Sequence, residues 1–230
     1  MASNFSQLES TLGVPFKNKA LLEQAFVHRS YLNENPGTRL DHNERLEFLG
    51  DAVIELAVTD YLYGNYPNPE GELTNFRAAL VNFQMLGALA LELGFNDCLL
   101  LSRGEMQDTG RAREVILANA FEAVAGAMYL DQGYGAVEQF LKRVLLPKLP
   151  TVVAAGKHRD AKSVFQEEAQ ERAKVTPIYK VHTEWGPDHA KNFRMGVYLG
   201  EELVAEGEGA SKQEAETAAA EEGLKAKGWR

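Results

Sequence analysis

The sequence predicts two domains, an all-α domain followed by a small α+β domain with the order α-β-β-β-α. Up to residue 146, apolar residues recur at helical spacing, and no segment shows convincing strand alternation. After residue 160 the spacing changes to one helix, three alternating segments and a second helix. A chain of 230 residues is long enough for one large domain or two small ones. We therefore expect domains at residues 1–150 and 161–230, joined by a linker at 151–160 that is rich in small and basic residues.

Five stretches of the first domain carry apolar residues at intervals of three and four, which is typical of helices. Turn-forming residues at 35–37, 66–69 and 131–133 separate several of them. Pro147 and Pro150 are expected to stop the last one. The predicted helices span residues 21–31, 46–63, 73–93, 114–130 and 136–146.

The second domain begins with helical composition and then shows the alternation of half-buried strands. Ser211, with Glu214 three residues later, forms a capping-box pattern that predicts a last helix running to Leu224. The remaining predicted elements are a helix over 162–174 and strands over 178–183, 192–199 and 202–208.

Composition narrows the class of protein. Cys98 is the only cysteine, which excludes an internal disulfide and a cysteine-based zinc site. No apolar run approaches 18 residues and the N-terminus does not resemble a signal peptide, so we expect a cytoplasmic protein that does not contact membranes. The net charge of −9 argues against nucleic-acid binding, which usually relies on a basic surface. Net charge ignores where the charges lie, however, so this argument depends on their placement.

Acidic residues gather on one face of the helix predicted over 46–63 and the turn before it. With about 100° per residue and Glu44 at 0°, Glu47, Asp51 and Glu55 all fall within about 60° of Glu44. The opposite face carries Leu46, Leu49, Val53, Leu56 and Ala57. A solvated acidic face is one interpretation of this pattern. Like charges at this spacing repel each other, so a compensating cation is the other.

Phe48 does not fit a purely solvated face. It lies near 40°, beside the acids and away from the apolar face. A large aromatic side chain in that place either covers a neighbouring element or enters a partner surface.

The helix over 114–130 is nearly all apolar, so we expect it to be buried. Its strongly polar residues after position 115 are Asn119 and Glu122, which share one face. A buried hydrogen bond or an arginine partner would explain Glu122. Alternatively, Glu122 faces Glu47 and Asp51 across a cleft that holds a divalent cation, and oxygen ligands favour magnesium or manganese over zinc. Glycines at positions 50 and 126 would let the two helices approach closely.

The pattern resembles the ribonuclease III family. Residues 44–51, ERLEFLGD, resemble the family signature, and residues 117–123, LANAFEA, resemble its second acidic motif. Residues 70–73, EGEL, followed by Arg77 and Ala78, resemble the intervening loop and helix. The signature is highly specific, and the match in order and type covers almost the whole chain.

The resemblance implies an endonuclease domain that forms a homodimer around double-stranded RNA. It places Glu47, Asp51, Asn119 and Glu122 at metal positions, for Mg²⁺ with Mn²⁺ as a substitute. The implied reaction is phosphodiester hydrolysis by metal-activated water, leaving 5′-phosphates and short 3′ overhangs, in ribosomal-RNA and messenger-RNA processing. The resemblance implies five catalytic residues: Glu47, Asp51, Glu122, Glu44 and Glu70, the last two at acidic positions near the RNA and the dimer interface. It also implies that Phe48 enters the other subunit.

Asn119 departs from the family, which usually has Asp at this position. Asn offers one carbonyl oxygen without a charge, although it can still bind a hard cation. Three functions therefore stay open: a metal-dependent nuclease, a double-stranded-RNA-binding protein with weakened or lost cleavage, and a structural ribosome-associated relative. Retention of the other acidic residues favours the nuclease.

Residues 162–228 resemble a double-stranded-RNA-binding domain. Such domains recognise A-form shape through 2′-hydroxyls in two minor grooves and the phosphates between them. The last helix would offer phosphate its N-terminal amides. Solvation or simple capping would also explain several of the matching residues. The residues expected to bind RNA are Gln166, Glu167, His189, Lys191, Ser211 and Lys212, with Gln213 replacing a residue that is often basic.

Overall fold

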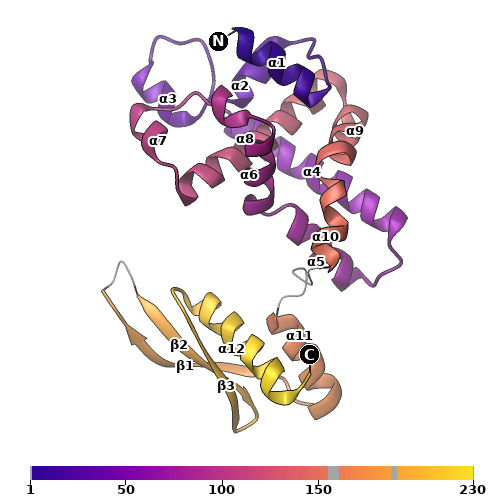
Figure 1. Cartoon of the computed structure of the whole chain (residues 1–230), viewed down its shortest axis with the longest axis vertical. Helices are drawn as coiled ribbons and strands as arrows, with labels where there is room; N and C mark the ends of the chain where they lie inside the picture. The colour runs from indigo at the N-terminus through magenta and orange to yellow at the C-terminus, as the bar shows by residue number, and fades with distance from the viewer. Residues whose placement is uncertain (1, 155–160, 188–190, 230) are drawn as a thin grey trace. The chain divides into compact units, whose positions relative to one another are not determined.

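The structure, a computed structural model, describes residues 2–154, 161–187 and 191–229 (Figure 1). The chain divides into two compact units, residues 1–158 and 159–230. The first unit is helical, and the second follows the order α-β-β-β-α, so the predicted fold class is confirmed. Of the expected linker, residues 151–154 form the end of helix α10, whereas residues 155–160 lie outside the described part.

The helical unit contains α-helices and short 3₁₀ turns joined by brief connections. No helix among the described residues is both long enough and apolar enough to cross a membrane. Its elements are α1 (Ala2–Leu12), α2 (Lys19–Ala25), α3 (Arg29–Glu34), α4 (Glu44–Asn65), α5 (Glu70–Leu80), α6 (Phe83–Glu92), η1 (Phe95–Cys98), α7 (Arg103–Gln107), α8 (Arg111–Gln132), α9 (Tyr134–Val144), η2 (Leu146–Lys148) and α10 (Leu149–Ala154).

Helix α8 forms the centre of this unit and packs on α2, α4, α6 and α9 (Figure 1). Helix α8 buries most of its apolar side chains against these neighbours, as its composition predicts. A run of aromatic contacts crosses the core from Phe26 through Phe95 and Phe121 to Phe140, with ring centroids 5.2, 6.1 and 5.6 Å apart. The acidic motif on α8 is therefore carried by the best-packed element of the unit.

The helix predicted over 21–31 is wrong as a single element. Val27 leaves the helical path and forms a parallel bridge with Leu100. The flanking backbone bonds run from Leu100 N–H to Phe26 O (2.9 Å) and from His28 N–H to Leu100 O (3.0 Å). This pairing with a residue far away in the sequence ends α2 and lets His28 begin α3 as its N-cap. A distant backbone partner thus overrides local periodicity.

The helix predicted over 73–93 also divides in two. Asn82 is the N-cap of α6, and its Oδ1 accepts a hydrogen bond from Met85 N–H at 2.9 Å. Capping by Asn favours a new helix start at this point. Helices α1 and α7 were not expected from the sequence.

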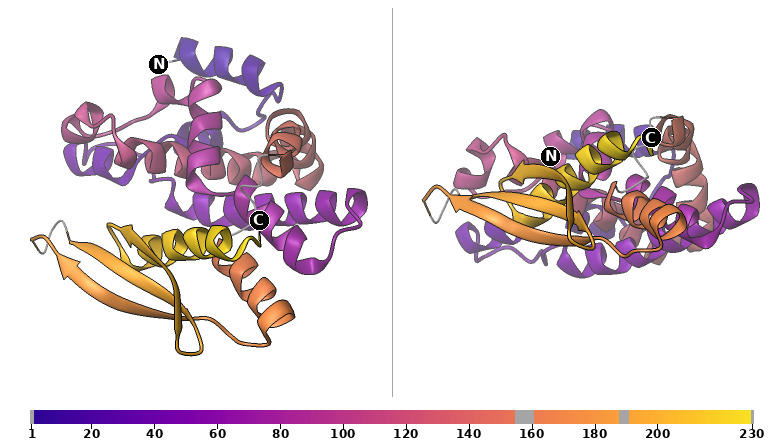
Figure 2. Two further views of the ribbon diagram at one scale, coloured as in Figure 1. Left: turned by 60° about the horizontal axis from the view of Figure 1, so that its bottom comes forward. Right: turned by 90° about the horizontal axis from the view of Figure 1, so that it is seen from below.

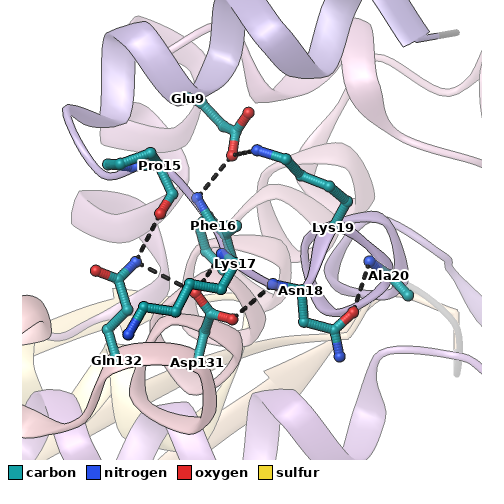
Figure 3. Close-up of polar contacts among 9 residues, drawn as sticks. All are labelled: Glu9, Pro15, Phe16, Lys17, Asn18, Lys19, Ala20, Asp131 and Gln132. Atoms are coloured by element: carbon teal, nitrogen blue, oxygen red, sulfur yellow. Dashed lines mark hydrogen bonds and ion pairs between the residues drawn. The ribbon is translucent and has the colours of Figure 1, made fainter.

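A polar network fixes the end of α8 to the segment before α2 (Figure 3). The Asp131 carboxylate accepts hydrogen bonds from Lys17 N–H and Asn18 N–H, both at 2.8 Å. These bonds, with that of Gln132, lower the pKa of Asp131 against the opposing effect of burial. Gln132 Nε2 also donates to Pro15 O at 3.0 Å. The last turn of α8 is therefore held by backbone groups far away in the sequence.

The second unit is a three-stranded antiparallel sheet, order β1-β2-β3, with both of its helices on one face (Figure 2). Phe165, Val197 and Leu224 form the middle of its small core. Gly207 lets α12 lie against the sheet, because a Cβ there would come within 2.1 Å of Ala219 N. The elements are α11 (Ala161–Glu168), the π-helical turn η3 (Ala169–Ala173), β1 (Ile178–Trp185), β2 (Asn192–Leu199), β3 (Glu202–Gly209) and α12 (Lys212–Lys227).

Candidate active site and RNA-binding surface

Helix α4 presents the first group of acids. It buries Leu46, Val53 and Ala57 against the rest of the helical unit. Glu47 on the other side is partly buried, and Asp51 is exposed. The predicted division into an apolar and an acidic face is thus confirmed, with one correction: Leu56, expected on the core face, is 58% exposed.

Helix α8 presents the second group. From residue 116 to residue 128, every residue is buried except Asn119 and Glu122, which are partly exposed. These two polar side chains form a narrow polar strip on the surface of an otherwise apolar, buried helix. The expectation that α8 is buried and that these two residues share an accessible face is confirmed.

Two glycines bring the helices together at this strip. A Cβ on Gly50 would lie 1.8 Å from the carbonyl oxygen of Glu122, and a Cβ on Gly126 would lie 2.2 Å from that of Leu46. No side chain fits at either distance, so the backbones of α4 and α8 meet only because both positions are glycine. The close approach predicted from these glycines is confirmed, and it places Glu122 beside the turn of α4 that carries Asp51.

Burial and neighbouring charges raise the pKa of two of these acids, Glu122 and Glu47. Burial, followed by the charges of Asp51 and Glu47, raises the pKa of Glu122 to about 7. Burial, followed by the charges of Glu44 and Asp51, raises the pKa of Glu47. A carboxylate raises the pKa of another in this way when the two lie near each other in a poorly solvated place. Glu47 and Asp51 of α4 therefore lie near enough to Glu122 of α8 to act on its carboxyl group.

No cation within the described chain neutralises this group. Neither a hydrogen bond nor an ion pair joins the side chains of Glu47, Asp51, Asn119 or Glu122 to another described residue. The alternative explanation for Glu122, an arginine partner or a buried hydrogen bond, is therefore not supported among the described residues. Three carboxylates and one amide oxygen are the donor types that suit a hard divalent cation, so by chemistry the set fits Mg²⁺ or Mn²⁺. Among the described residues, no three His, Cys, Asp or Glu side chains are already arranged as a coordination shell.

Glu44 and Glu70 differ from this group. Glu44 is exposed at the start of α4, 3.5 Å from the Arg29 guanidinium and 3.6 Å from His42 Nδ1. Glu70 is exposed in the first turn of α5 and does not contribute to the raised pKa of Glu47 or Glu122. It lines a depression of about 480 Å³ between α4 and α5, together with Leu62, Tyr63 and Arg77. The structure therefore does not bring Glu70 into the acidic group.

An exposed apolar strip runs along α4 beside the acids. Phe48 and Tyr63 are each 83% exposed, and Leu56 joins them. The place of Phe48 outside the core is as predicted. Tyr63 was missed because its helical angle gives no sign of what surrounds it.

In the second unit, the predicted RNA-binding residues lie on several elements. Gln166 and Glu167 are exposed on α11. Ser211 caps α12 by accepting a hydrogen bond from Glu214 N–H at 3.2 Å. Glu214 in turn accepts from Ala210 N–H at 3.0 Å, one residue earlier than an ideal capping box. His189 lies outside the described residues.

The basic residues near the start of β2 already have acidic or aromatic neighbours. Lys212 Nζ lies 5.7 Å from the Phe193 ring centre, which brings the start of α12 beside β2. Lys191 Nζ is 3.4 Å from a Glu184 carboxylate oxygen. Arg194 binds Glu208 at 2.5 Å and lies over the Trp185 ring. This neighbour for Trp185 was not predicted, because strand register and not sequence distance brings the two together.

Comparison with known proteins agrees with both motifs. Residues 18–149 match the family model described as Ribonuclease-III-like, which covers more than half of the chain. The chain belongs to the ribonuclease III family. Residues 161–227 match the double-stranded RNA binding motif. The resemblance identified from the two acidic motifs and the second domain is thereby confirmed, and the protein is an endoribonuclease of the double-stranded-RNA-specific ribonuclease III type.

Curated relatives match over nearly their whole length. Ribonuclease 3 of Oceanobacillus iheyensis is 48% identical over 94% of this chain and 95% of that protein. Ribonuclease 3 of Enterococcus faecalis is 44% identical over 96% of each. Among solved structures, the nuclease domain of ribonuclease III from Campylobacter jejuni matches with a TM-score of 0.57 and 36% identity, over 63% of this chain and 97% of that one. That structure describes flexibility in a region involved in dimer formation.

Proposed function

We propose that this ribonuclease III hydrolyses double-stranded RNA with the help of Mg²⁺, or Mn²⁺ in its place, held by Glu47, Asp51, Asn119 and Glu122. The observation that carries the proposal is the close contact of α4 and α8 at Gly50, which brings Glu122 near Glu47 and Asp51 without a cationic partner in the described chain. Such a group is unfavourable unless a cation binds or one acid keeps its proton.

The residues of α4 and α8 have separate tasks in this proposal. A bound divalent ion supplies an activated water and neutralises charge on the scissile phosphate. Glu122, whose pKa lies near 7, exchanges a proton for the cation when the site is filled. Asn119 adds a neutral oxygen, so the four-residue set carries one negative charge fewer than a set with Asp at that position.

Glu44 and Glu70 lie outside this group, and we propose that they act at the RNA and at the subunit interface. Glu44 already has Arg29 and His42 beside it. Its charge is therefore partly balanced, which suits a residue that orders neighbouring groups near RNA better than a metal ligand.

We further propose that the enzyme acts as a homodimer with one site per subunit. The support is the exposed strip of Phe48, Leu56 and Tyr63 on α4, which is costly in water unless a partner covers it. In a two-fold dimer the same surface meets itself, so Phe48 of one copy can enter the depression between α4 and α5 of the other. Two sites related in this way would cut both strands and leave 5′-phosphates with short 3′ overhangs.

We propose that the second unit holds the duplex through Gln166, Glu167, His189, Lys191, Ser211 and Lys212. Exposed polar groups on α11 suit 2′-hydroxyls, and the start of α12 suits phosphate. Structured cytoplasmic RNAs, namely ribosomal-RNA precursors and messenger RNAs, are the proposed substrates.

The deciding experiment is cleavage of a long RNA duplex by wild type and Glu122→Gln. Wild type should cleave with Mg²⁺ and not with excess EDTA, and mapping of the ends should show 5′-phosphates and 3′ overhangs. Glu122→Gln should bind the duplex but lose cleavage by about a hundredfold or more, as expected for removal of a group that stabilises the transition state. Full activity of this variant would contradict the metal-site assignment.

Asn119 supports a second candidate, a double-stranded-RNA-binding protein with weakened or lost cleavage. The amide removes one charge from the site that would bind the cation. Wild type that binds the duplex but leaves it intact in both Mg²⁺ and Mn²⁺ would establish this function. Co-sedimentation with ribosomes would then separate a free RNA-binding protein from a ribosome-associated one.

A further inference from the structure

We infer that Asn43 is a positioning residue for the acidic group, holding the first turns of α4, and therefore Glu47, at a set place relative to α8. The inference rests on the proposed function, because it assumes that Glu47 and Glu122 share a cation. Asn43 does not belong to the proposed ligand set, and its side-chain hydrogen bond goes to Ala25 O and to none of those four side chains.

Asn43 is the one strongly polar residue that is fully buried in the described part of the chain, at 3% exposure. It stands at the N-cap of α4, where Asn normally accepts a hydrogen bond from the helix's own amides. Here its side chain makes no such cap. Instead, Nδ2 donates to the carbonyl oxygen of Ala25, the last residue of α2, at 3.1 Å. The Asn43 side chain therefore makes a tertiary hydrogen bond to α2 and does not cap α4.

Two more bonds join the same short segments. Asn43 N–H donates to Val27 O at 2.9 Å. Gln24 Nε2 donates to His42 O at 3.3 Å. Residues 42–43 are thus held against residues 24–27 by one main-chain bond and two side-chain bonds.

The platform formed by residues 24–27 is itself anchored. Val27 pairs with Leu100 through the parallel bridge. Ser30 Oγ accepts a hydrogen bond from Ser102 N–H at 3.0 Å. The bond from Asn43 to residues 24–27 therefore attaches α4 to a segment that is itself hydrogen-bonded to the rest of the unit.

The bond from Asn43 to Ala25 affects the acidic group through the backbone of α4. Asn43 O accepts the first hydrogen bond of α4 from Glu47 N–H at 2.9 Å. Seven residues further on, or about 10 Å along the axis, Gly50 rests on the backbone of Glu122. The Leu46 carbonyl lies against Gly126, so α8 holds α4 from residue 46 onward. The attachment at Asn43 holds the turn of α4 that precedes this contact, and Glu47 N–H donates its backbone hydrogen bond to that turn.

The test compares Asn43→Ala with Asn82→Ala. Asn82 is a suitable control because it also stands at a helix N-cap position and donates Nδ2 to a backbone carbonyl, that of Ala79 at 2.9 Å. It lies at the start of α6, however, and not of α4. Mn²⁺ binding to the RNA-free protein is measured by the loss of the free Mn²⁺ electron-paramagnetic-resonance signal. Duplex cleavage is measured in parallel as a function of Mg²⁺ concentration. Melting transitions establish that each variant is folded at the assay temperature.

We expect Asn43→Ala to raise the Mn²⁺ dissociation constant and the Mg²⁺ midpoint about fivefold. This is less than the roughly 10–100-fold effect of groups that bond a metal ligand's side chain directly. In Asn43→Ala, the rate of cleavage at saturating Mg²⁺ should change less than the Mg²⁺ midpoint does. Asn82→Ala should lower stability but leave the Mn²⁺ dissociation constant and the Mg²⁺ midpoint unchanged. If Asn43→Ala does not fold, Asn43→Ser, which keeps a small hydroxyl donor, should show a smaller shift in the same direction.

The outcomes separate this inference from the proposed function. Wild type that binds no Mn²⁺ would overturn both. A second outcome would overturn the positioning role alone. In it, wild type binds Mn²⁺ through Glu122, but a folded Asn43 variant keeps its metal constants within about twofold of wild type. An equal shift in Asn82→Ala would also overturn it, because general loosening would then account for the effect.

Discussion

The acidic group of α4 and α8 contrasts with several glutamates of the RNA-binding unit. Those glutamates have basic partners within their unit, as in the ion pairs that join Glu216 to Lys162, Glu184 to Lys191 and Glu208 to Arg194. In the helical unit, Glu47 and Glu122 face one another without such a partner among the described residues.

The difference shows that net charge alone says little about function. The units have nearly equal charge: residues 1–159 carry 14 basic and 19 acidic side chains, net −5, and residues 160–230 carry 10 and 14, net −4. Partnered acids balance charge inside a unit. Unpartnered acids beside a buried helix create a need for an external cation.

The largest expected effect comes from the contact that brings the unpartnered acids together. Gly50→Ala should lower the free energy of unfolding by about 3 kcal/mol or more, because the new methyl group overlaps the Glu122 carbonyl. Urea denaturation measures the change, and cleavage should fall with it. Gly64→Ala is the matched control on the same helix: nothing lies within 4 Å of its Cβ, so it should stabilise by about 0.5–1 kcal/mol. Equal stability of the two variants would contradict the close contact.

The next effect is on the pH dependence of stability without metal. The unfolded chain loses the Glu122 proton near the ordinary pKa of 4.5, but the folded chain holds it to about 7. The folded state therefore binds more protons between these values, and the free energy of unfolding falls as pH rises from about 4.5 to 7. We expect a loss of about 2 kcal/mol in EDTA, allowing for partial solvent screening.

Denaturation in EDTA at pH 5 and pH 8 measures this loss. Glu122→Gln should make the free energy of unfolding nearly independent of pH in EDTA. For the wild-type protein at pH 8, adding Mg²⁺ should restore the stability that is lost in EDTA. A wild-type profile that is already flat in EDTA would mean that the acids do not interact as the structure shows.

A smaller effect is expected from restoring the missing charge. Asn119→Asp should lower the Mg²⁺ concentration needed for half-maximal cleavage by about tenfold, which corresponds to about 1.4 kcal/mol. The reason is the added carboxylate on the face shared with Glu122. Titration of cleavage against Mg²⁺ measures the change. A cooperative melting transition of the variant is the control for folding, at a lower temperature than wild type in EDTA because the added carboxylate repels its neighbours. An unchanged midpoint would place residue 119 outside the metal site.

The smallest effect concerns the RNA-binding unit. Because many of its basic residues already have acidic neighbours, few of them are available to release counterions from RNA, and the salt dependence of duplex binding should be shallow. Lys212→Ala, at the start of α12, should reduce the slope of log K against log salt by about one. Lys225→Ala is the control, since Lys225 pairs with Glu222 in the last turns of that helix. Filter binding with the cleavage-deficient Glu122→Gln protein measures both slopes. A larger loss for Lys225→Ala would contradict this assignment of the RNA-binding surface.

Some sequence predictions failed, for physical reasons that local patterns do not contain. Periodicity over 21–31 is compatible with one helix, but the bridge between Val27 and Leu100 breaks it. Leu56 has the helical angle of a core residue, yet it is 58% exposed because no element of the described helical unit buries it. Asn43 has the sequence position of an ordinary cap, and its bond to Ala25 depends on a neighbour 18 residues away.

The sequence by itself determined the two-unit fold, the family and the identity of the acids on each motif, because helical periodicity and motif spacing are local properties of the chain. Only the tertiary structure decided which backbone atoms of α4 and α8 meet at the predicted glycines, which acids lack a partner, and which group the Asn43 side chain binds. Contact, burial and the pKa of Glu122 depend on what other segments bring to a residue. No spacing along one helix specifies those neighbours.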